Sequence, residues 1–254
     1  MISMRYVPAF YFLIIHPARA NTAMSLPQTL EVIHFSSKVS YVNVDTSTHQ
    51  GIDRAKRLNL VSAGLADVVI SPLLHKASTL FNPYQRGRMF TIIRHPVDRA
   101  ASLFYFIQET QWKQSATRSD QFADISIEEF YKSGFAENNW MVRFLLNELT
   151  KELTENDLNI AKVILRQKCL VGLLEEKDET MARLQQYFGW TTSDEDKRCI
   201  EKKLDWAWPM KHKHPMIEKD SKAWTLIVAN NSFDMKLYDF AKELFNQQGQ
   251  QLFP

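Results

Sequence analysis

The sequence predicts an α/β protein in which a mainly parallel central sheet lies between two layers of helices, a three-layer sandwich. Strand-like and helix-like runs alternate along the chain, which is the order that βαβ units produce. One run, Met89–Ile93, is β-branched and apolar on both faces, as expected of a strand covered on each side. No repeat of fixed period interrupts the alternation. In folds of this kind, ligands bind beyond the carboxyl ends of the strands.

The composition indicates one globular domain. Of the 254 residues, 45% are hydrophobic, which is enough to build a single sizeable core. The net charge of +2 is too small to attract nucleic acid through overall charge, so we expect no nucleic-acid partner and infer that any anion site is local. The spacing of Cys169 and Cys199 excludes a CxxC metal or redox motif and favours two buried thiols.

The N-terminal segment, residues 1–25, is predicted to be a leader that precedes the domain over 26–254. Arg5 stands before an apolar run from Tyr6 to Ile15, and Ala18-Arg19-Ala20 resembles the small-residue cleavage site of a signal peptide. Pro8 interrupts the run, which is shorter than the roughly 20 residues that span a bilayer. Two alternatives stay open: a signal would place the protein in the Golgi, the secretory pathway or at a membrane, and otherwise it is cytoplasmic.

The first elements after the leader are predicted from short runs. Tyr41–Val44 is a strand candidate, and Ile52–Leu60 has the spacing of a helix. Asp67–Ile70 is predicted to be a second strand, closed by Ser71-Pro72. The strand Met89–Ile93 follows.

A helix is predicted directly after that strand. Pro96 suits the first turn of a helix, because its φ angle is already fixed and its missing N–H is not needed there. Apolar residues then recur at helical spacing from Val97 to about Trp112. The later part of the chain predicts four more helices and one more strand. The first helix starts with a capping box at Ser126, and the last is stopped by Gly189. The other predicted bounds are helices over Asn138–Leu146, Glu155–Gln167 and Asp178–Phe188, and the strand Lys168–Leu174.

Arg94 and Ser102 form the candidate anion site. Arg94 stands at the carboxyl end of the strongest strand, and Ser102 follows eight residues later in the second turn of the helix. A guanidinium pairs with phosphate oxygens through two parallel hydrogen bonds, a hydroxyl can donate to a third oxygen, and the helix N-terminus adds backbone N–H groups. The alternative is structural, with Arg94 capping the helix and pairing with Asp98. Arg99 is expected to form an ion pair that stabilises the turn, and His95 to pack or to face solvent.

The pattern R-x-P-x-x-R-x-x-S from Arg94 to Ser102, followed by the aromatic run Leu103-Phe104-Tyr105-Phe106, resembles the 3′-phosphate element of the sulfotransferase superfamily. Val171–Glu175 and its helix, which ends in Phe188-Gly189-Trp190, are similar to the next strand–helix unit of the carbohydrate-type branch. The resemblance covers about Asp67–Trp190. It implies a P-loop-NTPase-like sulfotransferase fold, 3′-phosphoadenosine 5′-phosphosulfate as donor, a hydroxyl of a carbohydrate or similar acceptor, and no metal.

The resemblance also implies roles for further residues. His75 is expected in a loop, Ser71–His75, just after the predicted strand Asp67–Ile70 and on the same rim of the sheet as Arg94. It is the candidate base that accepts the acceptor's proton, since histidine titrates near neutral pH, and the alternative is a purely structural histidine. Lys211 and Lys213, in a late basic cluster, are candidates for a second phosphate contact, with a solvated loop as the alternative.

The sequence departs from the superfamily at the loop that wraps the 5′-phosphosulfate. Ahead of Tyr41, Ser36-Ser37-Lys38 offers hydroxyls and a lysine but no glycine to let the backbone approach a phosphate. Lys38 is then a substitute for the lysine of that loop, or the chain has lost its first strand and loop, or the protein is a non-catalytic relative that binds a nucleotide or a partner. A nucleotide kinase is disfavoured because the chain has no Gly-Lys pair, and a zinc hydrolase because it has no HExxH.

Overall fold

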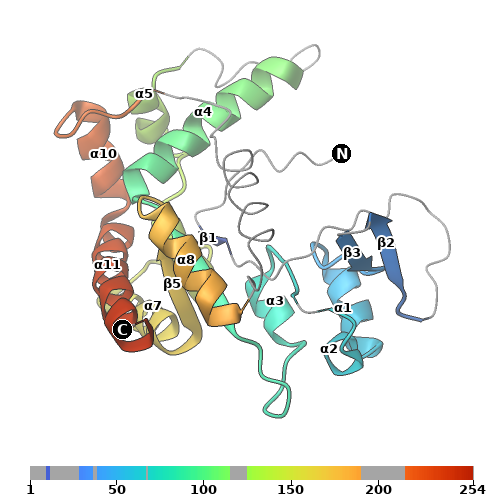
Figure 1. Cartoon of the computed structure of the whole chain (residues 1–254). Helices are drawn as coiled ribbons and strands as arrows, with labels where there is room; N and C mark the ends of the chain where they lie inside the picture. The colour runs from blue at the N-terminus through green and yellow to red at the C-terminus, as the bar shows by residue number, and fades with distance from the viewer. Residues whose placement is uncertain are drawn as a thin grey trace. The chain divides into compact units, whose positions relative to one another are not determined.

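The computed structural model of the chain (Figure 1) describes two compact units. One unit comprises residues 11–91, and the other comprises residues 1–10 together with 92–254. The predicted leader lies outside the described residues except for β1 (Phe10–Tyr11). The described ranges are residues 10–11, 29–36, 39–66, 68–114, 125–189 and 215–253.

The unit of residues 11–91 contains an antiparallel hairpin and three short helices. The hairpin pairs Val32 with Val42 and Ile33 with Tyr41. The predicted strand at Tyr41–Val44 therefore lies mostly in the second hairpin strand. The elements are β2 (Val32–Ser36), β3 (Val39–Val42), α1 (His49–Arg57), α2 (Leu60–Ala63) and α3 (Leu74–Ser78).

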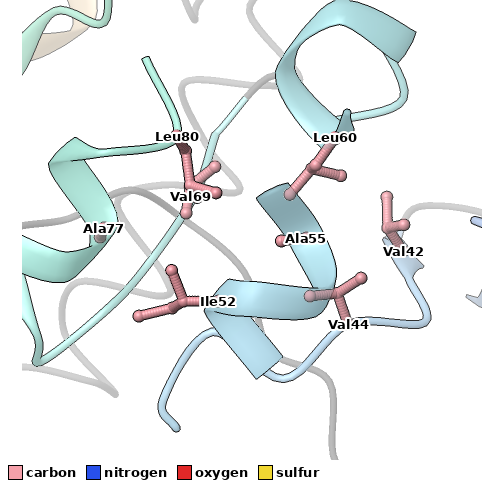
Figure 2. Close-up of a cluster of buried hydrophobic side chains, with 8 residues drawn as sticks. All are labelled: Val42, Val44, Ile52, Ala55, Leu60, Val69, Ala77 and Leu80. Atoms are coloured by element: carbon pink, nitrogen blue, oxygen red, sulfur yellow. The ribbon is translucent and has the colours of Figure 1, made fainter. Parts of the chain in front are cut away.

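The core of this unit is a cluster of aliphatic side chains from the end of the hairpin, from α1 and from the segment around α3. Figure 2 shows Ile52 and Ala55 of α1 in the middle of the cluster, with both side chains fully buried. Thr48 caps the N-terminus of α1 by accepting a hydrogen bond from the N–H of Gly51 at 3.0 Å. The cluster consists of Val42, Val44, Ile52, Ala55, Leu60, Val69, Ala77 and Leu80.

The strand predicted at Asp67–Ile70 is wrong for the described residues 68–70, which form no strand. Side chains satisfy the backbone here, since the Thr46 hydroxyl donates to the carbonyl of Ile70 and the Ser71 hydroxyl accepts from the N–H of Leu73. Val69 is buried in the core cluster. The apolar run therefore reflects burial of an irregular segment.

The second unit is mainly helical. Seven of its described elements are helices, and three of them, α7, α8 and α11, pack against the strand β5. The preceding strand β4 spans the division between the units at Thr91 and Ile92. The elements are β4 (Met89–Ile93), α4 (Pro96–Gln114), α5 (Ile127–Lys132), α6 (Trp140–Leu146), α7 (Glu155–Lys168), β5 (Cys169–Leu173), α8 (Lys177–Phe188), α10 (Lys222–Asn230) and α11 (Ser232–Leu252).

The two predicted parallel strands are present and adjacent. The strand order is β1–β4–β5, so β4 is central, as its apolar character predicts, and β4 and β5 run parallel. The N–H of Leu174 donates to the carbonyl of Ile93 at 2.9 Å. All five residues of β5 are buried, because α7, α8 and α11 pack against the strand (Figure 1). Cys169, at its start, is a buried thiol as predicted.

Side chains close the outer edge of β5. Gln248 of α11 accepts from the N–H of Val171 and donates to the carbonyl of Cys169, each at 2.9 Å. The Thr180 hydroxyl of α8 bonds both the N–H and the carbonyl of Leu173 at 2.9 Å. These are the groups that another strand would pair with, so the edge is satisfied without one.

Helices α6 and α11 cap each other. Neither has a side-chain cap of its own. The carboxylate of Asp234 in α11 accepts from the N–H groups of Met141 and Val142 in α6, both at 2.9 Å. Asn139, before α6, accepts from the N–H groups of Phe233 and Asp234 at 2.8 and 3.2 Å. The two helix N-termini therefore satisfy their free donors reciprocally.

Other local predictions are confirmed. Ser126 and Glu129 form a capping box at the start of α5, and α8 ends at Gly189, whose φ of 66° is left-handed. The protein is a mixed α/β structure with one small parallel and one small antiparallel sheet among the described residues.

Candidate functional site

The predicted strand, turn and helix around Arg94 are present. β4 ends at Ile93, Arg94 and His95 form the turn, and α4 begins at Pro96. Ser102 lies in the second turn of α4 and is partly exposed. Arg94 is buried, with 7% of its surface exposed. Little of the Arg94 surface is therefore open to a ligand in this structure.

Helical spacing defines the side of α4 on which Ser102 lies. Ser102 follows Asp98 by four residues and His95 by seven, so all three project along one stripe of the helix. Val97 and Ala101, each one residue before Asp98 and Ser102, are fully buried. The candidate hydroxyl is therefore on the partly exposed side of α4.

His95 caps α4 and ties it to β5. Its Nδ1 accepts from the N–H of Val97 at 3.3 Å, and its carbonyl accepts from the N–H of Arg99 at 3.0 Å. Its own N–H donates to Oε1 of Glu175 at 2.8 Å. Nδ1 thus carries no proton in this arrangement.

The bond to Glu175 was not predicted from the sequence. The positions of the two residues could have indicated this hydrogen bond, because His95 follows the end of β4 by two residues and Glu175 follows the end of β5 by two residues. Carboxyl ends of neighbouring parallel strands meet at one edge of a sheet. Glu175 is therefore a positioning residue for the turn that contains Arg94.

Two aromatic rings enclose the His95 imidazole. Trp224 stacks on it with ring centroids 5.5 Å apart, and Tyr238 approaches edge-on at 5.0 Å. Burial lowers the pKa of His95, although the nearby carboxylates of Asp98 and Glu175 oppose the shift. Burial, together with the charge of Glu175 and a hydrogen bond with it, raises the pKa of Tyr238. Both groups are therefore neutral at pH 7. Of the two alternatives predicted for His95, packing and facing solvent, the ring contacts show packing.

Arg99 forms the predicted ion pair. Its guanidinium pairs with the carboxylate of Glu137 and lies 5.2 Å from the ring centroid of Trp140. Only 3% of Arg99 is exposed. This arginine therefore fastens the start of α4 to the segment that leads into α6.

The other predicted site residues belong to the other unit or are outside the described residues. His75 is exposed and lies within α3, so the loop predicted around it is wrong. It belongs to the unit of residues 11–91, whereas Arg94 and Ser102 belong to the other unit. Lys38, Lys211 and Lys213 lie outside the described residues.

A pocket of about 390 Å³ opens beside the later turns of α4. Phe104 and Tyr105 line it, and Arg94 and Ser102 are not among its described lining residues. This pocket is therefore distinct from the predicted anion site. Within the part of the chain that the structure describes, no three His, Cys, Asp or Glu side chains gather to hold a metal ion. Of the described helices, none combines the length and the apolar character needed to cross a bilayer.

Comparisons of the chain with protein-family models, with curated proteins and with solved structures found no match.

Proposed function

We propose that the protein is a sulfotransferase that moves a sulfuryl group from 3′-phosphoadenosine 5′-phosphosulfate to a hydroxyl of a carbohydrate or similar acceptor. One observation carries the proposal: Arg94, Pro96 and Ser102 occupy the turn, the first position and the second turn of a strand–helix unit. This is the arrangement that the motif requires. The proposal includes the finer fold, a three-layer P-loop-NTPase-like sandwich with β4 and β5 in its central parallel sheet.

In this proposal Arg94 and Ser102 hold the 3′-phosphate of the donor. The guanidinium supplies a charged planar fork, and the hydroxyl of Ser102 donates to another phosphate oxygen. The N-terminus of α4 adds a partial positive charge. Arg99 takes no part, because Glu137 and Trp140 already engage it.

The reaction proposed is a single in-line transfer. The acceptor oxygen forms a bond to sulfur while the bond between sulfur and the bridging phosphate oxygen breaks, and 3′-phosphoadenosine 5′-phosphate leaves. His75 accepts the proton of the acceptor hydroxyl. Lys38, or Lys211 or Lys213, stabilises the charge on the leaving phosphate.

The alternative is a non-catalytic protein that binds a nucleotide or a partner through the same anion site. It is favoured by the segment ahead of Tyr41, where Ser36-Ser37-Lys38 has no glycine to admit a phosphate. A transfer assay with labelled sulfate donor and a panel of sugar acceptors separates the two functions. Transfer that His75→Ala abolishes, with donor binding retained, supports the enzyme. Donor binding without transfer to any acceptor supports the alternative.

A further inference from the structure

The pocket beside α4 is built from three segments of one unit. They are the second half of α4, the start of α5 and the segment that leads into α10. The Gln108 side chain of α4 donates to the carbonyl of Ile125 at 3.0 Å, which fixes the first two segments together. The described lining residues are Phe104, Tyr105, Gln108, Ile125, Ser126, Ile127, Glu128, Pro215, Met216, Ile217, Glu218, Ser221 and Ala223.

The charged groups of this lining are all acidic. Glu128 and Glu218 contribute carboxylates, and none of the described lining residues is a lysine, arginine or histidine. Neither carboxylate forms an ion pair with a described residue. Burial and the negative charge of Glu128 raise the pKa of Tyr105, which lines the same pocket. The described lining therefore favours cations over phosphate and sulfate.

Aromatic and aliphatic side chains form the rest of the wall. Phe104 is held rigidly, since it is 2% exposed and its ring centroid lies 5.4 Å from that of Phe130. Tyr105 meets Phe104 edge-on at 5.1 Å. Ile125 and Ile217 pack against a buried hydrophobic cluster of this unit that contains Phe104 and Phe130. Such a wall favours a ligand with an apolar body, and aromatic ring faces also attract cations.

We propose that this pocket binds an organic cation, an ammonium group carried on an apolar body. Glu128 and Glu218 pair with the ammonium, and the wall around Phe104 and Tyr105 covers the apolar body. The proposal does not depend on the assignment of Arg94 and Ser102, because neither is among the described lining residues of this pocket.

The test uses two probes of the same shape, phenethylamine and 2-phenylethanol, which carry an ammonium and a hydroxyl at pH 7. Ligand-observed NMR at low ionic strength measures the dissociation constant of each probe with the full-length protein. We expect the amine to bind at least about tenfold more tightly than the alcohol, and Glu128→Gln or Glu218→Gln to weaken the amine about threefold to tenfold. Glu243→Gln, a change on the exposed side of α11, is the matched control and should leave the affinity unchanged.

The outcomes separate this proposal from the proposed function. Equal binding of amine and alcohol would overturn the proposal, and so would amine binding that neither Glu128→Gln nor Glu218→Gln weakens. It would also be overturned by no binding of the amine at 10 mM, which is roughly the weakest affinity expected of a small ligand. Arg94→Ala should leave amine binding intact. Failure of nucleotide binding with retained amine binding would thus count against the sulfotransferase alone.

Discussion

Replacement of Asp234 by asparagine should change how the stability of the protein depends on pH. Asp234 is fully buried, and its carboxylate accepts the N–H groups of Met141 and Val142. Burial raises its pKa from 3.8 to about 6, against the lowering effect of these two hydrogen bonds. Between these two pH values the folded protein holds a proton that the unfolded chain has lost, so stability falls as the pH rises.

The magnitude follows from the pKa of Asp234. A rise to about 6 corresponds to about 3 kcal/mol for the complete titration, at about 1.4 kcal/mol for each tenfold change in proton affinity. About 2 kcal/mol of this is expected between pH 4.5 and 7.5. The asparagine side chain of the variant does not titrate but can accept only one of the two N–H groups, which costs about 1 to 3 kcal/mol at every pH. Asp234→Asn should therefore be less stable than the wild type at both pH values, and the gap in the free energy of unfolding should be about 2 kcal/mol larger at pH 4.5 than at pH 7.5.

Urea unfolding at several pH values measures this difference directly. Asp239→Asn, an exposed position on the same helix, is the control, and its stability difference from the wild type should vary by no more than about 0.5 kcal/mol over the same range. A gap between Asp234→Asn and the wild type that stays constant, or that widens as the pH rises, would refute the reasoning. It would mean that the helix N-terminus, and not burial, governs the ionisation of Asp234.

Two further substitutions test how β4 and β5 are stabilised. Gln248→Leu should lower the free energy of unfolding by about 2 to 4 kcal/mol, because it leaves the N–H of Val171 and the carbonyl of Cys169 buried without partners. Urea unfolding measures this loss, and a loss below about 0.5 kcal/mol would contradict the prediction. Thr91→Val should raise the free energy of unfolding by about 1 kcal/mol, because the Thr91 hydroxyl is fully buried and makes no hydrogen bond with a described residue. A destabilised variant in a thermal melt would show that the hydroxyl has a partner.

Local chemistry explains which elements could be predicted. The strand Met89–Ile93 and the helix start at Pro96 follow from β-branched residues and from the fixed φ of proline, which act within a few positions. The capping box at Ser126 likewise depends on neighbours three residues apart. The strand prediction at Asp67–Ile70 was wrong because an apolar run indicates burial and not a particular backbone shape. A buried irregular segment, whose Ile70 carbonyl accepts from the Thr46 hydroxyl, has the same pattern as a strand.

Contacts between distant segments explain what could not be predicted. Gln248 closes the edge of β5 from 77 positions away, and Asp234 caps α6 from 93 positions away. The sequence around neither residue indicates its hydrogen-bond partner, because a buried amide or carboxylate can face any backbone group. The same limit applies to the site: the motif located Arg94 and Ser102 in the right turn and helix, but gave no measure of how deeply Arg94 is buried.

Calorimetric titration with adenosine 3′,5′-bisphosphate tests the proposed function most directly. The wild type should bind, Arg94→Lys should bind about tenfold more weakly because lysine lacks the planar fork, and Arg94→Ala should lose about 1.5 to 3 kcal/mol of binding free energy. Arg57→Ala, an exposed arginine of α1, should bind like the wild type. A wild-type protein that does not bind the bisphosphate, or a folded Arg94→Ala variant with unchanged affinity, would contradict the assignment of Arg94 to a nucleotide phosphate.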